Sequence, residues 1–201
     1  FGAEKSAKVK GNDLVITKDM ILFDSISRIV GPDNTIHICH IEDICLQSHR
    51  QSYVIIDTLR NNVFYTEITN RLIEIEPESI CIMSPFGIRK CMIGTPVTFV
   101  SRTISKEAFQ NTVLYGYVNS WRPEIVFTQK QHQVISLVMQ RKTDRYIAQE
   151  MSISLKTLSI HKYNIMLLLN IRKFSHLLTH RFAVYFCNET TGYLLASSGS
   201  K

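Results

Sequence analysis

The run from Phe127 to Leu178 constrains the fold more than any other part of the chain. Three residues with a side-chain oxygen, Thr128, Thr143 and Ser154, each stand directly before a helical pattern of apolar residues. Such oxygens accept hydrogen bonds from the free N–H groups of a first helical turn, so these positions predict three helix starts. With one more helix after them, the run is expected to form four short helices.

The second and third of these helices are separated by a tight turn at Ser152–Ile153. At about 100° per residue, the third helix has one stripe that is expected to be buried, formed by Leu158, Ile165 and Leu169. Its opposite face carries Lys156, Ile160 and Tyr163, flanked by Ser159 and Asn164. A short helix, a turn and a longer helix with a mixed outer face is the layout of a helix-turn-helix.

This segment resembles the LuxR/FixJ-type DNA-binding domain of bacterial transcription regulators. The matching residues are Phe127, Thr128, Gln133, Val134, Leu137, Lys142, Ile147, Ala148, Ile153, Ser154, Lys156, Thr157, His161, Asn164, Ile165 and Leu177. The family usually has glycine where this chain has Arg141 and Ser152. The resemblance therefore implies a positive φ at both positions, which costs a non-glycine residue about 1 kcal/mol.

The resemblance also implies roles for individual side chains. Four residues of the third helix are expected to enter the major groove and read bases: Lys156, Ser159, Ile160 and Tyr163. Six are expected to contact phosphates: Lys130, Lys142, Arg145, Thr157, His161 and Lys162. Two alternatives stay open. His161 can instead be an imidazole at the edge of the core. Leu167, where the family often has a basic residue, can face a protein partner or pack on the linker or tail.

The charge distribution agrees with a polyanion contact in the carboxyl-terminal part. Residues 1–126 hold 13 Lys and Arg against 14 Asp and Glu, whereas residues 127–201 hold 10 against 3. A basic surface alone is weak support, because many solvated helices are basic. Coinciding with a helix-turn-helix, it points to nucleic acid.

The front of the chain alternates apolar runs with helical patterns. Strands are expected at Leu14–Ile16, Thr35–Cys39, Ser52–Asp57, Ser79–Met83 and Pro96–Val100. Helices are expected at Asp19–Val30, Ile41–Gln47, Val63–Ile75 and Ser105–Tyr117, with a short helix or loop at Phe86–Met92. This alternation predicts a doubly wound parallel sheet of five strands with right-handed crossovers.

An α/β unit of this kind resembles the receiver domain of response regulators. Receiver chemistry needs a phosphoacceptor aspartate after the third strand and two acidic residues after the first strand that hold Mg²⁺. Asp57 stands at the phosphoacceptor position and Ser84 at the hydroxyl position, but Thr17 and Lys18 replace the acidic pair, with Asp19 beside them. The receiver lysine falls at Ser101 or Arg102. We therefore expect a degenerate receiver in which Asp57 is vestigial.

Further stretches extend the resemblance: SYVIIDTLRNNVF, MSPFGIRKCMIGTPVTFVSRTI, and KQHQVIS with the later ISLKT and HKYNIM. They are similar to the DctR-like enterobacterial regulators of acid stress and virulence. The implied organisation is a receiver-like domain at 13–117, a linker at 118–126, a DNA-binding domain at 127–185 and a tail at 186–201. The implied function is sequence-specific control of stress or virulence genes without phosphorylation.

Other classes of function find little support. The five cysteines form no CxxC pair, which favours reduced, mostly buried thiols in a cytoplasmic protein and argues against a metal site, although a redox-sensing pair stays open. No apolar run has the length of a membrane span. No catalytic triad or glycine-rich phosphate loop is recognisable, so we expect no enzymatic activity and no cofactor.

The expected partner is double-stranded DNA, bound by a homodimer across two half-sites. Lys173–Tyr185 is predicted to be a helix whose Phe174 and Phe182 stay exposed for a second copy. The alternative is a monomer in which the tail covers these rings. A rival function is an accessory regulator that acts mainly by binding another transcription factor.

Overall fold

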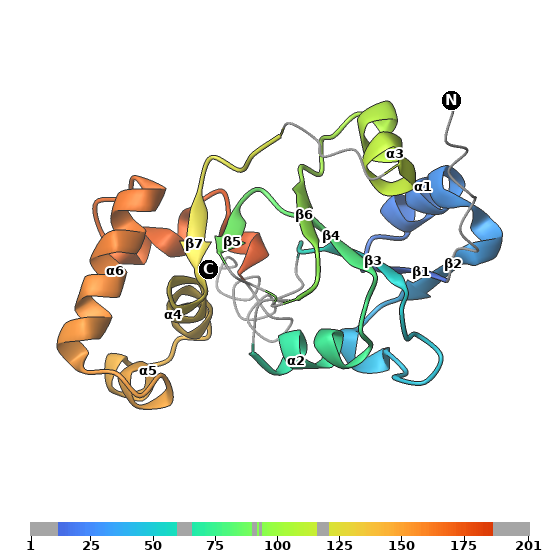
Figure 1. The fold of residues 1–201 in the computed structure, drawn as a ribbon. Coiled ribbons are helices and arrows are strands. Elements are labelled where there is room, and N and C mark those ends of the chain that lie inside the picture. Colours follow the sequence, from blue (N-terminus) through green and yellow to red (C-terminus); the bar gives the residue numbers. More distant parts are fainter. Residues whose placement is uncertain (1–11, 60–65, 90–91, 93, 116–120, 187–201) are drawn as a thin grey trace, which may run out of the picture.

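In the computed structural model, which describes residues 12–59, 66–89, 92, 94–115 and 121–186, the amino-terminal part is built on a parallel sheet (Figure 1). Its strand order is β2-β1-β3-β4-β6, and every neighbouring pair is parallel. The strands are β1 Asp13–Ile16, β2 Thr35–Ile38, β3 Tyr53–Asp57, β4 Ser79–Met83 and β6 Val97–Val100. The predicted five-stranded doubly wound sheet is confirmed.

Helices cover both faces of this sheet. Helices α1 (Met20–Val30) and α3 (Lys106–Tyr115) contact each other on one face, and α2 (Thr66–Glu74) lies on the other (Figure 1). Because side chains alternate along a strand, neighbouring residues enter different cores. Ile56 packs in a core that includes Leu72, whereas Ile55 packs in a core that includes Phe109. Burial on both faces explains the apolar runs of the central strands β1, β3 and β4, whereas the edge strands β2 and β6 are only partly buried.

The connecting segments contain short 3₁₀ turns. Gly31 ends α1 with φ of 127°, and η1 (Pro32–Asn34) follows it. The helix expected at Ile41–Gln47 is only η2 (Ile41–Asp43). Of the helix expected at Val63–Ile75, residues 63–65 lie outside the described residues.

A second, two-stranded sheet was not expected. The segment predicted as a short helix or loop contains strand β5 (Gly87–Arg89), which pairs in parallel with β7 (Val126–Thr128). A Cβ atom at Gly87 would lie 2.9 Å from Cγ of Pro123, so glycine permits this close approach. The segment expected to be a linker therefore ends in a strand that is hydrogen-bonded to the receiver-like part.

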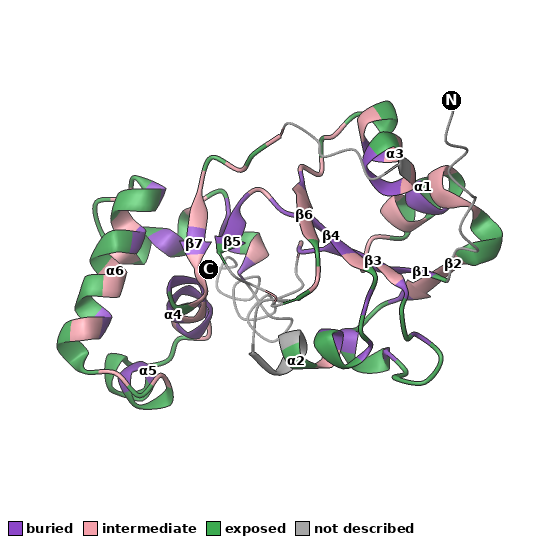
Figure 2. Cartoon of the chain, viewed as in Figure 1, coloured by how far each residue is buried: buried purple, intermediate pink, exposed green. Residues whose placement is uncertain are grey.

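Phe86 lies at the junction between this small sheet and the carboxyl-terminal helices. Its ring stacks on Phe186 at 5.0 Å between centroids and meets the edge of Phe127 at 5.3 Å. His132 is 1% exposed and its ring centroid is 5.8 Å from that of Phe86. One apolar core runs from the sheet through these rings into the helices. Figure 2 shows the buried residues continuing from the strands into β5 and α4.

Three of the four expected carboxyl-terminal helices are present. They are α4 Gln129–Met139, α5 Asp144–Glu150 and α6 Leu155–Leu169, and their N-caps are Thr128, Thr143 and Ser154, as predicted. The fourth was predicted wrongly. Lys173–Tyr185 forms two 3₁₀ segments, η3 (Phe174–Thr179) and η4 (Ala183–Tyr185), separated where His180 adopts an extended backbone.

This break also changes the exposure expected for the aromatic residues. Phe182 is only 9% exposed and its ring lies 6.1 Å from that of Phe86, so the expectation of an exposed Phe182 was wrong. Phe174 is half-buried, with the ammonium of Lys162 at 5.1 Å from its ring centroid. Both rings contact side chains of the same chain, and the buried Phe182 supplies no open surface for a second copy.

Candidate nucleic-acid interface

Local hydrogen bonds fix the turn between α5 and α6. Oγ1 of Thr143 accepts from the N–H of Tyr146 at 3.3 Å, and Oγ of Ser154 accepts from the N–H of Thr157 at 3.0 Å. Ser152 has φ of 52° and Arg141 has φ of 59°, as the family's glycines implied. The short turn therefore sets the direction of α6 relative to α5.

The inner side of α6 anchors it. Leu158, Ile165 and Leu169 are at most 5% exposed, as predicted from their spacing, and they share a core with Ile147 of α5. Because this stripe is buried, the opposite side of α6 must face outward.

The four predicted base-reading residues all lie on exposed positions of α6. Ile160 is 53% exposed and Tyr163 is 57% exposed, and Lys156 and Ser159 are exposed as well. The hydroxyl of Ser159 donates to the carbonyl oxygen of Leu155 at 3.0 Å. Helix α6 stands at the end of the molecule away from the five-stranded sheet (Figure 1), so the receiver-like part does not cover it.

The side chains predicted to contact phosphates differ in their solvent exposure. Lys130, Lys142 and Arg145 are exposed, and the Lys142 ammonium lies 4.9 Å from the ring centroid of Tyr146. Thr157 is half-buried, with its hydroxyl 2.9 Å from Oγ of Ser154. His161 is half-buried, and burial together with the nearby Lys130 charge lowers the pKa of its imidazole. That imidazole is therefore mainly neutral at pH 7.

Lys162 already has a partner within the domain. Its Nζ lies 2.6 Å from Oδ1 of Asp144, at the start of α5. The pair ties α6 to α5 across the turn. A phosphate contact by Lys162 would have to compete with this carboxylate.

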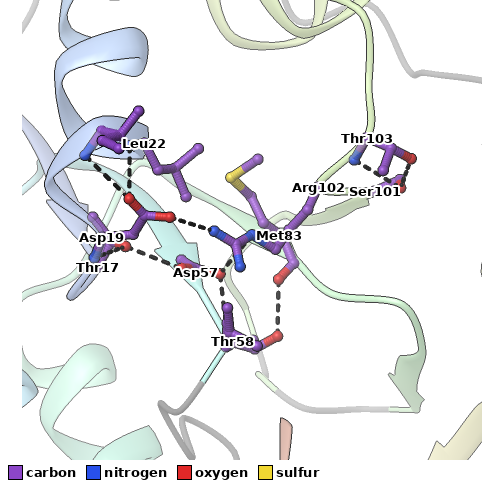
Figure 3. Close-up of polar contacts among 11 residues, drawn as sticks. Thr17, Asp19, Leu22, Asp57, Thr58, Met83, Ser101, Arg102 and Thr103 are labelled. Atoms are coloured by element: carbon purple, nitrogen blue, oxygen red, sulfur yellow. Dashed lines mark hydrogen bonds and ion pairs between the residues drawn. The ribbon is translucent and has the colours of Figure 1, made fainter. Parts of the chain in front are cut away.

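The receiver-like pocket consists of Thr17, Asp19, Asp57 and Arg102, whose side chains contact one another (Figure 3). Asp57, at the end of β3, is 1% exposed, and Oγ1 of Thr17 donates to its Oδ2 at 3.0 Å. Its Oδ1 accepts from the N–H of Leu59 at 3.1 Å and lies 3.5 Å from Nε of Arg102. Nη2 of Arg102 donates to Oδ2 of Asp19 at 3.0 Å. Of the two candidates for the receiver lysine position, Arg102 is the one that reaches the aspartate.

These residues do not fit Mg²⁺. The pocket joins one carboxylate from Asp57 to a hydroxyl from Thr17, and a guanidinium occupies the place of a cation. The second carboxylate, Asp19, caps α1 through its Oδ1, and the N–H of Leu22 and then Arg102 lower its pKa. Burial raises the pKa of Asp57, opposed by the N–H of Leu59 and by Arg102. Ser84 is fully buried, and its Oγ accepts from the N–H of Phe86 at 3.3 Å.

Comparison with known proteins agrees with both halves of this description. Residues 13–123 match the family model "GadE/DctR transcriptional regulator, N-terminal domain". The chain belongs to this family. Residues 125–180 match the model "Bacterial regulatory proteins, luxR family". The chain is thus a DNA-binding transcriptional regulator of the luxR type.

Individual relatives align over nearly their whole length. The HTH-type transcriptional regulator DctR of Escherichia coli K12 is 36% identical over 172 residues, covering 86% of this chain and 98% of that protein. The transcriptional regulator GadE of the same strain is 29% identical over 175 residues, with the same coverage. Among solved structures, the response regulator StyR is 15% identical, covers 85% of this chain and 97% of its own, and has a TM-score of 0.39.

The cysteine side chains differ from one another in exposure. Cys81 is buried, but Cys39 and Cys45 are exposed, so the expectation of mostly buried thiols was wrong for these two; Cys91 and Cys187 lie outside the described residues. Within the described ranges, no helix is long and apolar enough to cross a membrane. The same ranges contain no group of three His, Cys, Asp or Glu side chains suited to a metal ion.

Sequence reasoning left the pairing of Arg102 with Asp57 and Asp19 undecided, and it missed the role of Phe86. The two candidates for the lysine position are adjacent, and only coordinates show which one turns toward the pocket. Phe86 lay in a segment read as a short helix or loop. The one available signal was Gly87 directly after a large aromatic residue, which is typical of a close backbone approach.

Proposed function

We propose that this regulator recognises specific DNA sequences through the outer face of α6 and acts without phosphorylation of Asp57. The observation that carries the proposal is the exposure of Lys156, Ser159, Ile160 and Tyr163 on a helix whose opposite stripe is buried. Lys130, Lys142 and Arg145 supply positive charge for phosphates, and Thr157, His161 and Lys162 are weaker candidates for the same role. The division into domains at 13–117 and 127–185 belongs to the same proposal.

Independence from phosphorylation is supported by the pocket. Phosphoryl transfer to a carboxylate needs a metal ion to neutralise the incoming charge. Here Arg102 supplies the cation from within the chain, and Thr17 stands where a metal-binding carboxylate would be needed. The activity of the regulator is then set by its abundance or by a partner. We place its targets among stress or virulence genes, on the resemblance alone, and mapping of the sites bound across the genome tests that assignment.

We also propose that two copies bind DNA together. The support is general: one helix-turn-helix makes few base contacts, and coupling two half-sites raises affinity without new ones. The contact between copies does not use Phe182, which is buried at the domain junction. Sedimentation with and without a selected duplex tests this, and a one-to-one complex on a site whose halves are both required would refute it.

The direct test of DNA recognition is selection of duplexes from a random pool by the full chain, followed by affinity measurement on the selected sequence. Replacing Tyr163 with alanine should change which sequence is selected. Leu168→Ala is the matched control, because Leu168 is a 39% exposed apolar residue of the same helix on a different side. Uniform loss of affinity across all sequences with Tyr163→Ala would exclude base reading by Tyr163.

An accessory regulator that binds another transcription factor is the second candidate. Two observations favour it: Leu167 is 62% exposed at the end of α6, and Lys162 is held by Asp144 rather than being open to phosphate. The same selection separates the two candidates. If the full chain enriches no sequence and binds all duplexes equally weakly, specific DNA recognition is refuted and the accessory role is favoured.

A further inference from the structure

The exposed surface of α6 is rich in large apolar side chains, some of which lie on its outer face. Of the large apolar side chains exposed in the described part of the chain, five lie on this one helix: Leu155, Ile160, Tyr163, Leu167 and Leu168. Ile160, Tyr163 and Leu167 follow one another at spacings of three and four residues and so share one side. Exposed apolar surface that is continuous along a helix indicates a contact with a partner.

The charges around this stripe identify the kind of partner. Helix α6 has no acidic residue, and its two lysines are Lys156, on the same outer side, and Lys162, which is paired with Asp144. Exposed Lys130, Lys142 and Arg145 lie on the neighbouring helices and the connection between them. An apolar stripe within basic surroundings is complementary to a polyanion that itself carries apolar groups. In duplex DNA, the apolar group of the major groove is the C5 methyl of thymine.

We propose that Ile160 and Leu167 contact thymine methyl groups, so that the recognised half-site contains thymines along the major groove where α6 lies. This rests on the proposed DNA-binding function and specifies its sequence class. Adenine, guanine and cytosine have no methyl group in the major groove, so these side chains would cover polar base edges without gaining an apolar contact, which disfavours them. Asn164, exposed on the adjoining side, has an amide suited to the N6 and N7 atoms of adenine.

The distance between Ile160 and Leu167 limits how far apart the two thymines can be. Ile160 and Leu167 are seven residues apart, which is roughly 10 Å along a helix that rises about 1.5 Å per residue. Base pairs are stacked about 3.4 Å apart, so the two side chains reach positions separated by at most roughly three base-pair steps, and by fewer where α6 is tilted from the duplex axis. Leu167 is thus assigned as a specificity-determining residue in addition to the four named above.

The test uses the full chain and a duplex selected from a random pool, in which each thymine is replaced in turn by deoxyuridine. This replacement removes only the methyl group and keeps base pairing. At two positions within roughly three steps of each other, affinity should fall roughly fourfold, because one buried methyl group contributes about that factor. In Leu167→Ser, the effect of deoxyuridine should vanish at one of these positions and persist at the other. Leu168→Ser, which changes a neighbouring leucine that is 39% exposed on another side, should behave as wild type.

The possible outcomes distinguish a failure of thymine-methyl recognition from a failure of the proposed DNA-binding function. If a sequence is selected but all deoxyuridine duplexes bind like the thymine duplex, methyl recognition is refuted and specific DNA binding stands. If Leu167→Ser weakens thymine and deoxyuridine duplexes equally, Leu167 does not read a methyl group. If no sequence is selected, the proposed function itself fails.

Discussion

The pocket at the end of β3 and the outer face of α6 are the two places where the sequence suggested a functional site, and they differ in whether their side chains already have partners. In the pocket, the carboxylate of Asp57 is buried and held by Thr17, Leu59 and Arg102. On α6, Ile160, Tyr163 and Leu167 are each more than half exposed. Groups that already have partners inside the chain stabilise the fold, whereas groups left exposed are available to a ligand.

The same contrast distinguishes positions within the helix-turn-helix. Lys162 points toward Asp144 and links α5 to α6, whereas Lys156 one turn and a half earlier is exposed. Two lysines on one helix thus have different roles, one in orienting the helix and one in contacting the ligand. The following predictions test how far this separation of roles extends.

The largest effect is expected from Arg102→Ala, which leaves Asp57 buried without its guanidinium. Removing one member of a buried pair is strongly destabilising, and with Arg102 20% exposed we expect roughly 2–3 kcal/mol at neutral pH. Losing a positive neighbour raises the pKa of Asp57 further, so the loss should shrink as the pH falls and the carboxyl becomes protonated. Urea unfolding at several pH values measures both the loss of stability and its dependence on pH.

Arg50→Ala is the matched control for that experiment. Its pair with Glu76 is short, 2.7 Å, but both side chains are more than half exposed. Exposed pairs of this kind contribute about 0–1 kcal/mol. Adding Asp57→Asn to Arg102→Ala should restore much of the stability. Equal losses in the two single variants would show that the pocket pair is no more important than a surface pair.

A somewhat smaller effect on stability is expected from replacing His132, the buried imidazole of α4 beside Phe86. Burial lowers its pKa to about 3, whereas the unfolded chain takes up the proton near pH 6.5. Acid therefore favours unfolding, and roughly 2 kcal/mol of stability should be lost between pH 7 and pH 5 through this residue. His132→Leu should flatten the stability profile over that range, and the same change at exposed His176 should leave the slope as in wild type. An unchanged slope in His132→Leu would show that this imidazole is not the acid-sensitive group.

How well each part could be predicted from the sequence follows from the length of its pattern. The five strands of the large sheet and helices α4 to α6 have enough apolar residues, together with caps at Thr128, Thr143 and Ser154, to define their period. Strands β5 and β7 have three residues each, which is too short for a period to be distinguished from a loop. Their pairing is decided by tertiary contacts around Phe86 and Gly87.

The prediction of a fourth carboxyl-terminal helix was wrong for a related reason. Spacings of three and four residues between Phe174, Leu177 and Leu178 also fit turns of 3₁₀ helix, and the rings beyond them are drawn to Phe86 rather than to α6. For the candidate site, the outward side of α6 followed from a 3.6-residue period alone. The partner of Lys162 did not, because Asp144 is distant in sequence and becomes a neighbour only after the turn folds.

Lys142→Ala should have a modest effect that appears mainly in the salt dependence of DNA binding. If the exposed ammonium of Lys142 neutralises one phosphate, the slope of log affinity against log salt should become shallower by about 1 for every duplex alike. Lys106→Ala, an exposed lysine on α3 in the receiver-like part, should leave the slope as in wild type. If both variants have the wild-type slope, Lys142 is not a phosphate contact.

No phosphorylation and no change in DNA binding are expected when the chain is incubated with acetyl phosphate and Mg²⁺. A metal ion entering the pocket would meet the Arg102 guanidinium, and a phosphoryl donor would meet an Asp57 whose oxygens already accept from Thr17 and Leu59. Intact-mass measurement should show no added phosphate, and affinity for the selected duplex should be unchanged. A stoichiometric adduct that is lost in Asp57→Asn and that alters DNA binding would show that the pocket is a working phosphoacceptor. The contrast between a closed pocket and an open helix would then be wrong, because Arg102 would have to move aside during the reaction.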